Sequence, residues 1–134
     1  MTKEIEFKTL QDTIAVQKAN GTNVNYYIFD EYEIHLNQIK PHSIQEWHYH
    51  SQIEETLLVT KGELCCKYLE NNMEQRRNVK QGELVLVKNS IHTFENNTDE
   101  SVEFVVFRFV PSGENKQNII KNDKVVVDIE KTNY

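Results

Sequence analysis

The chain has 134 residues and a mass of 15.8 kDa, with 38% hydrophobic and 27% charged residues. This size and composition predict one globular domain over residues 1–134. With 15 Lys and Arg against 21 Asp and Glu, the formal net charge is −6, so the average surface repels nucleic acid and anionic membranes. No apolar run approaches the roughly 20 residues that cross a bilayer, and the start, MTKEIEFKTLQD, is charged where a signal peptide is apolar. We therefore expect a cytoplasmic protein with no nucleic-acid or membrane partner.

Short apolar runs, rich in β-branched and aromatic residues and bounded by turn residues, recur along the chain. Two segments suit short helices, although neither carries a long apolar stripe of helical period. In chain order, we expect a helix within 3–19, strands at 24–39, 55–60, 63–69, 83–87, 92–94 and 102–110, a helix within 113–121, and a strand at 125–128. The pattern predicts an all-β fold with short peripheral helices, arranged as an antiparallel sandwich or barrel.

The two cysteines, Cys65 and Cys66, are adjacent in a predicted strand. Neighbouring strand residues point to opposite faces, so these thiols cannot form an ordinary disulfide with each other. We expect two free cysteines that act as small apolar strand residues, as fits a reducing compartment.

Three of the five histidines belong to two local patterns that suit metal binding. His48 and His50 are one residue apart, so on a strand both imidazoles leave the same face. A carboxylate follows at Glu54 or Glu55, where the next apolar strand begins, and His92 follows a turn further on. Imidazoles with one carboxylate suit divalent iron, manganese, cobalt, nickel, copper or zinc.

These residues resemble the first motif of the cupin superfamily, which runs Gly, five residues, H-x-H, three or four residues, Glu, six residues, Gly. The matching positions are His48, His50, Glu55 and Gly62. The match favours Glu55 over Glu54 as the motif carboxylate. His42 stands where the motif has its first Gly.

The second cupin motif runs Gly, five residues, Pro-x-Gly, two residues, His, three residues, Asn. It is matched by Gly82, His92 and Asn96, with the first spacing one residue short. Val87 replaces the proline, and Asn89 replaces the second glycine. Since Asn is the residue other than Gly that best tolerates positive φ, we expect Asn89 to take that conformation.

The resemblance implies a cupin-type double-stranded β-helix, a jelly-roll barrel with a motif core at about residues 42–96. It also implies that His48, His50, Glu55 and His92 bind a divalent transition metal (Fe, Mn, Ni, Co, Cu or Zn) inside the barrel. The implied function is that of a small metal-dependent enzyme acting on a small polar molecule, with dioxygenase or isomerase/epimerase chemistry. The alternative is a cupin that binds or senses a small molecule without catalysis.

Two further residues are candidates for a catalytic role. Glu46 shares a strand face with His48 and His50 and is either a base near the metal or an exposed carboxylate at the barrel mouth. Arg108 lies in an apolar run, VEFVVFRFV. It either holds a substrate carboxylate with two hydrogen bonds or points outward.

Aromatic residues next to the histidines suggest self-association. If His48 and His50 point inward, Trp47 and Tyr49 point outward, and a contiguous aromatic surface usually marks an interface. We expect a two-fold homodimer with Trp47 and Tyr49 in or near the contact. The alternative is that an N-terminal strand of the same chain covers them.

Overall fold

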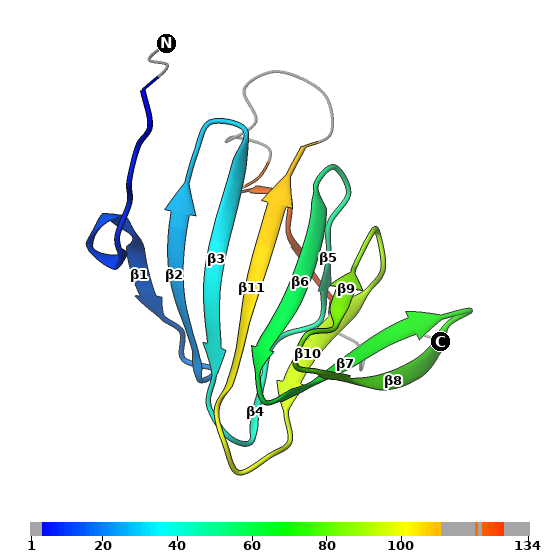
Figure 1. The fold of residues 1–134 in the computed structure, drawn as a ribbon. Helices are drawn as coiled ribbons and strands as arrows, with labels where there is room; N and C mark the ends of the chain where they lie inside the picture. Colours follow the sequence, from blue (N-terminus) through cyan, green and yellow to red (C-terminus); the bar gives the residue numbers. More distant parts are fainter. Residues whose placement is uncertain (1–3, 111–119, 121, 128–134) are drawn as a thin grey trace.

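The computed structural model describes residues 4–110, 120 and 122–127, which form two antiparallel sheets with a shared core (Figure 1). One sheet has the order β1 (Ile14–Gln17), β2 (Thr22–Ile28), β3 (Tyr32–Ile39), β11 (Val102–Phe109), β6 (Glu54–Lys61), β9 (Leu84–Leu86). The other has the order β12 (Val125–Val126), β5 (His48–Tyr49), β10 (His92–Asn96), β7 (Glu63–Glu70), β8 (Met73–Lys80), and β4 (Ser43–Ile44) also pairs with β10. The all-β prediction is confirmed.

The helix predicted within residues 3–19 is wrong over its described part. The segment contains only a 3-10 turn, η1 (Leu10–Asp12), followed by strand β1. Ile14 and Val16 alternate with the smaller or polar residues Thr13, Ala15 and Gln17. The segment pairs with β2, and this period of two suits a strand and not a helix. The helix predicted within 113–121 lies outside the described residues except for Ile120.

Strand β8 was not predicted, because its sequence MEQRRNVK has a single buried residue, Val79. The strand forms by pairing along its whole length with β7. Asn71 and Asn72 connect the two strands with φ of 53° and 61°, which is the backbone of a tight hairpin turn that Asn tolerates well. Turn chemistry and backbone pairing therefore determine this strand.

Two other predicted segments need correction. The segment 24–39 is two strands, β2 and β3, separated by three residues. Residues between β4 and β5 are not strand, so the predicted strand face shared by Glu46, His48 and His50 is interrupted before His48. The predicted strand at 125–128 is present as β12 over its described part.

The core lies between the sheets and is built from their inward-facing residues. It contains Ile39, Leu57, Val59, Leu64, Cys66, Val79, Val87, Phe94, Val102, Phe104 and Val106. Cys65 and Cys66 are buried and free, as predicted, and burial raises the pKa of Cys66 to about 11. No helix among the described residues is long and apolar enough to span a membrane.

The turn before β10 differs from the motif comparison. Positive φ falls on Lys88, at 50°, and not on Asn89. The Ser90 amide donates to the Val87 carbonyl at 3.1 Å, which closes the turn around both residues. The prediction of a left-handed Asn89 is therefore wrong by one residue.

Because Lys88 and Asn89 are both exposed, substitution at either mainly tests the backbone. We expect Lys88→Val to lower the free energy of unfolding by about 1–3 kcal/mol, since a β-branched residue is strained at positive φ. Asn89→Val should cost less than half as much. Chemical denaturation of both variants measures the difference, and a larger loss for Asn89→Val would contradict the turn geometry.

Candidate metal centre

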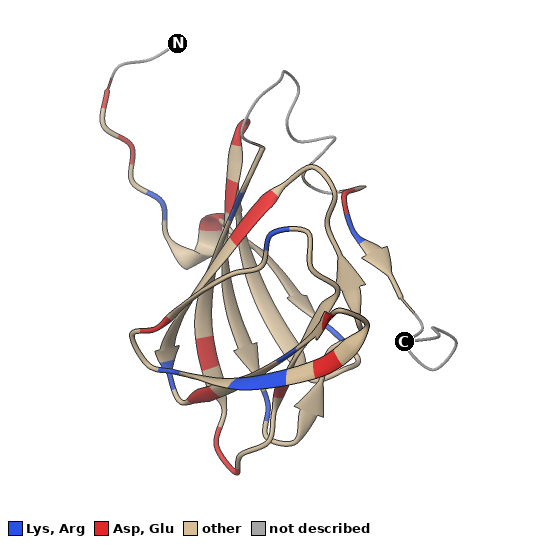
Figure 2. Ribbon diagram, turned by 90° about the vertical axis from the view of Figure 1, so that its right-hand side faces the viewer, with Lys and Arg blue, Asp and Glu red and all other residues tan. Residues whose placement is uncertain are grey.

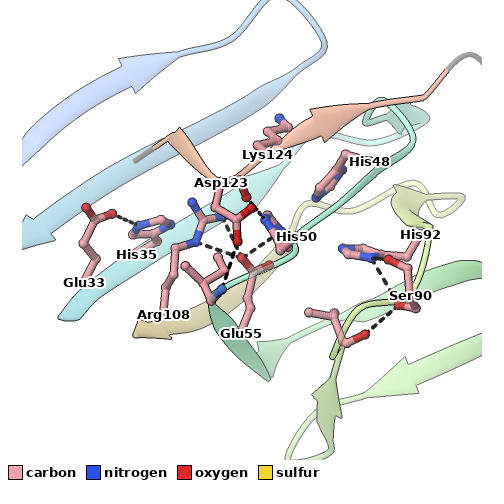
Figure 3. Close-up of polar contacts among 12 residues, drawn as sticks. Glu33, His35, His48, His50, Glu55, Ser90, His92, Arg108, Asp123 and Lys124 are labelled. Carbon is pink, nitrogen blue, oxygen red and sulfur yellow. Dashed lines mark hydrogen bonds and ion pairs between the residues drawn. The ribbon is translucent and has the colours of Figure 1, made fainter. Parts of the chain in front are cut away.

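His48 on β5, His50 just after it and His92 at the start of β10 converge in the interior (Figure 3). All three are buried, and one ring nitrogen from each lies within 4.8 Å of the others. Antiparallel pairing of His48 with His92 sets the two strands side by side. The sequence prediction that these histidines meet is confirmed.

Each of the three rings is oriented by the same type of hydrogen bond. The Nδ1 atom of His48 lies 3.0 Å from the Glu46 carbonyl, that of His50 2.5 Å from the Asp123 carbonyl, and that of His92 2.9 Å from the Ser90 carbonyl. A carbonyl oxygen only accepts, so each Nδ1 carries the proton and donates it. The Nε2 atoms are then unprotonated in the neutral rings, and their lone pairs are available to a metal.

The surroundings favour neutral imidazoles. Burial, together with the neighbouring His92, lowers the pKa of His48 to about 3. Burial likewise lowers the pKa of His92. The Nε2 atoms of His50 and His92 are buried and have no hydrogen-bond partner among the described residues. Buried polar atoms are nearly always paired, and two unpaired acceptors directed at one site suit a metal ion.

Glu55, at the beginning of β6, contacts one side of the cluster. Its Oε2 lies 3.3 Å from His50 Nε2 and accepts hydrogen bonds from Arg108 Nε at 2.9 Å and from a terminal Arg108 nitrogen at 2.7 Å. Burial opposes ionisation of Glu55, but the charge of Arg108 outweighs it and holds the pKa to about 2. Glu55 is therefore a buried carboxylate between a guanidinium and an imidazole.

With His50 as the Nδ1–H tautomer, its contact with Glu55 joins two acceptors. Nε2 of that tautomer carries a lone pair, and the ionised Glu55 has no proton to give. Two such lone pairs lie 3.3 Å apart, with the Arg108 guanidinium on the other side of the carboxylate. Two donors bound to one transition metal at about 2.1 Å each are separated by roughly 3–3.5 Å, so the residues present fit a metal ion.

The last described segment completes the site from a distant part of the sequence. Asp123 accepts hydrogen bonds from the amides of Ser51, Gln52 and Ile53 and from the Ser51 hydroxyl. Although burial raises the pKa of Asp123, these donors lower it overall, to about 2. The same residue supplies the carbonyl that orients His50. Asp123 therefore fixes the loop between β5 and β6 while it positions one imidazole.

Glu46 lies at the edge of the site. Its carboxylate forms an ion pair with Lys124 and accepts a hydrogen bond from Asn20 at 3.3 Å. The Lys124 contact lowers the pKa of Glu46 to about 2. Its backbone carbonyl orients His48, as described above.

A second buried pair, Glu33 and His35 on β3, lies beside Arg108 (Figure 3). His35 Nε2 is 2.7 Å from Glu33 Oε1, and Tyr26 packs edge-on against the imidazole with ring centroids 4.5 Å apart. Burial lowers the pKa of His35, and the Glu33 hydrogen bond only partly offsets this. The structure thus places His35 in the core with Glu33 as its partner.

A cavity of about 400 Å³ lies between the sheets, and His48 is the member of the histidine cluster that lines it. Glu55, Arg108, Lys124 and the Glu33–His35 pair are among the polar residues of its wall. Its apolar residues are Ile14, Val16, Val24, Ile28, Leu57, Phe94, Phe104 and Val106. Arg108 therefore faces the interior, and its predicted alternative of pointing outward is wrong.

Several residues of this site could not be recognised in the sequence. Asp123 and Lys124 gave no signal, because they lie 73 and 78 residues after their partners His50 and Glu46 and follow no motif. Glu33 gave a weak signal that was not used: it alternates with His35 and Asn37 along β3, which predicts one shared face.

Figure 2 shows acidic and basic residues interspersed over the ribbon when the molecule is viewed from the side of β7 and β8. Among the described residues, Arg108 pairs with Glu55 and Lys124 with Glu46 at the cavity, and the half-buried Lys67 pairs with the buried Glu95 on β10.

The fold and the site together define a small double-sheet protein with a histidine cluster at one end of an internal cavity. A family model described as "Cupin domain" matches residues 35–108. The chain belongs to this cupin family. No curated protein matches the chain significantly.

Solved structures with the same fold include metabolic enzymes of low sequence identity. A variant of oxalate decarboxylase from Bacillus subtilis aligns with TM-score 0.70 and 16% identity over 90% of this chain and 32% of its own. Oxalate oxidase in complex with the substrate analogue glycolate aligns with TM-score 0.66 and 22% identity, over 90% of this chain and 63% of the oxidase. A cupin-superfamily sugar phosphate isomerase from Silicibacter pomeroyi aligns with TM-score 0.62 and 18% identity. This alignment covers 78% of this chain and 75% of the isomerase.

The chain thus spans about a third of the decarboxylase and under two thirds of the oxidase. At these identities the likeness shows the fold. The predicted cupin jelly roll is confirmed.

The buried His35 predicts a pH dependence of stability in the metal-free protein. Its pKa is below 6.5 in the folded chain, so the unfolded chain binds more protons as the pH falls through 6.5, and the free energy of unfolding decreases. Removing the imidazole in His35→Gln should reduce this slope by up to about 1.4 kcal/mol per pH unit. Urea unfolding between pH 7.5 and 5 measures it.

His42→Gln is the control, because His42 is exposed and bound to Asp99 at the surface. The slope should match that of the unmodified protein. Equal slopes for the unmodified protein and His35→Gln would show that His35 does not remain neutral in the folded chain.

Proposed function

We propose that this protein binds a divalent transition metal through His48, His50 and His92, with Glu55 as a fourth ligand. We further propose that it is a small metal-dependent enzyme acting on a small polar molecule in the adjoining cavity. Imidazole with one carboxylate suits Fe, Mn, Ni, Co, Cu or Zn, and does not select among them.

The observation that carries the proposal is the pair of buried Nε2 atoms without hydrogen-bond partners, on His50 and His92. A water molecule could satisfy one such acceptor. Three lone pairs and a carboxylate directed at one small volume instead call for a positive charge, because each group is an acceptor and none supplies a proton.

A divalent ion bound here would act as a Lewis acid toward a substrate oxygen or a bound water, and iron or manganese would add redox capacity. The chain's own residues would bind and orient the substrate. The charged residues of the cavity wall balance without the ion, since Lys18, Arg108 and Lys124 offset Glu33, Glu46 and Glu55. A divalent ion then leaves an excess of two positive charges, which favours an anionic substrate.

The reaction types proposed are oxidation of the substrate by dioxygen and isomerisation or epimerisation. Its apolar wall around Phe94, Phe104 and Val106 would limit water near a reacting group.

Non-catalytic binding or sensing is the second candidate, and one observation favours it. Each carboxylate of the cavity wall already has a cationic or imidazole partner: Glu33 has His35, Glu46 has Lys124 and Glu55 has Arg108. A general base would have to leave its partner before accepting a proton.

Metal content tests the centre. Elemental analysis of protein purified without chelator or added metal should give about one transition-metal ion per chain. A metal present at 100 times its dissociation constant should raise the free energy of unfolding by about 2.7 kcal/mol. His48→Ala, His50→Ala and His92→Ala should each lose most of the metal and this stabilisation, whereas His42→Ala should retain both.

Glu55→Ala and Glu54→Ala form a matched pair, because the neighbouring carboxylates lie on opposite faces of β6, one buried and one exposed. Glu55→Ala should lose more metal than Glu54→Ala. Equal retention in the two variants would exclude Glu55 as a ligand.

Turnover separates the two functional candidates. The metal-loaded protein is screened with small organic acids and sugars for oxygen uptake with Fe(II) and for product formation by NMR. Conversion that disappears in His92→Ala supports the enzyme. Stoichiometric binding that persists without metal and without conversion supports the sensor.

We also propose that the protein forms a homodimer through the surface around Trp47 and Tyr49. Both residues are half-buried, and β12 of the same chain pairs with Tyr49. Sedimentation should show a dimer that Trp47→Glu with Tyr49→Glu converts to a folded monomer. A monomeric unmodified protein, or a double variant that remains dimeric, would contradict the proposed contact.

A further inference from the structure

Arg108 is a half-buried cation in the wall of the cavity, and it already holds a carboxylate. Its side chain is 16% exposed, and Nε and one terminal nitrogen both donate to Glu55 Oε2, at 2.9 and 2.7 Å. A guanidinium presents its donors in a planar fork that matches carboxylates. The contact therefore demonstrates, within the chain itself, that a carboxylate fits at this position.

Strand pairing fixes Arg108 between two acidic residues. On β11 it lies directly opposite Glu55 of β6 and Glu33 of β3. Glu33 has His35 as a partner at 2.7 Å. Glu55 accepts hydrogen bonds from two Arg108 nitrogens, and it also lies next to His50.

The Glu55 carboxylate cannot neutralise Arg108 fully and bind a metal beside His50 at the same time. Its Oε2 is shared between two Arg108 nitrogens and lies 3.3 Å from His50 Nε2. When Glu55 is a metal ligand, its negative charge is drawn to the ion and its attraction for Arg108 decreases. A guanidinium that is largely removed from water is unfavourable without a full counter-charge. Arg108 would therefore favour a second anion.

We propose that Arg108 is the carboxylate-binding group of the cavity, and that Glu55 occupies it as an internal competitor. The ligand class is a small carboxylic acid whose carboxylate replaces that of Glu55 on Arg108. The remainder of this small molecule would extend into the 400 Å³ cavity along Phe94, Phe104 and Val106. Its identity as a substrate rests on the proposed function, whereas carboxylate binding by Arg108 does not require a metal.

Binding to the metal-free protein tests this directly. Protein treated with EDTA and dialysed is titrated with propionate, and with propionamide as the neutral counterpart, by calorimetry and by the ¹⁵N-detected Nε–H signal of Arg108. Glu55→Gln removes the competing charge while keeping the size of the side chain. It should bind propionate at least tenfold more tightly than the unmodified protein, with a shift of the Arg108 signal.

Three comparisons decide the result. Glu54→Gln should bind propionate like the unmodified protein, because Glu54 is exposed. Glu55→Gln combined with Arg108→Met should lose the gained affinity for propionate. Propionamide should bind every variant more weakly than propionate binds Glu55→Gln. The proposal is wrong if Glu55→Gln shows no gain, if the double variant keeps the gain, or if propionamide binds as well as propionate.

If Glu55→Gln does not fold by circular dichroism, Glu55→Asp replaces it. The shorter arm withdraws the carboxylate from Arg108, so propionate affinity should again rise, and no rise would reject the proposal. Metal content of the same unmodified protein is measured before chelation. If Glu55→Gln gains propionate affinity but the unmodified protein contains no metal, this proposal stands and the metal centre is rejected. If the protein contains metal but Glu55→Gln gains no affinity, the metal centre stands and this proposal is rejected.

Discussion

Hydrogen bonds from three imidazole Nδ1 atoms to the carbonyls of Glu46, Ser90 and Asp123 determine the chemistry of this interior. Carbonyls accept only, so they fix each proton on Nδ1 and leave each Nε2 lone pair facing the centre. Side-chain acceptors could exchange roles with a change of protonation, whereas a backbone carbonyl cannot. The cluster is therefore arranged for a cation before one arrives, which reduces the reorganisation that metal binding requires.

This arrangement depends on contacts across the whole chain. Asp123 holds His50 through its carbonyl and holds the amides of Ser51 and Ile53 through its carboxylate. On the other side, Arg108 of β11 keeps Glu55 ionised beside the histidines. Metal binding would favour the folded state because these groups converge only there. For the same reason, a substitution at Asp123 would alter the orientation of His50, although the Asp123 side chain is not one of the proposed metal ligands.

The sequence predicted the histidine cluster because its signals are local. His48 and His50 alternate on one strand, and Glu55 and His92 follow at the motif spacing. His42, which replaces the motif's first glycine, adopts φ 55°, so a backbone requirement of the motif persists after the residue has changed. Strand β8 and the partners Asp123 and Lys124 could not be predicted, because backbone pairing and long-range docking leave no periodic pattern in side-chain polarity.

We expect the metal-free protein to hold His48, His50 and His92 as Nδ1–H tautomers before any metal binds. Long-range ¹H–¹⁵N correlation spectra of the imidazoles, recorded at pH 7 after chelation and assigned with single His→Gln variants, measure these tautomers. All three rings should show a protonated Nδ1 and an unprotonated Nε2. Protons on Nε2, or doubly protonated rings at that pH, would show that the cluster is not arranged for a cation in advance.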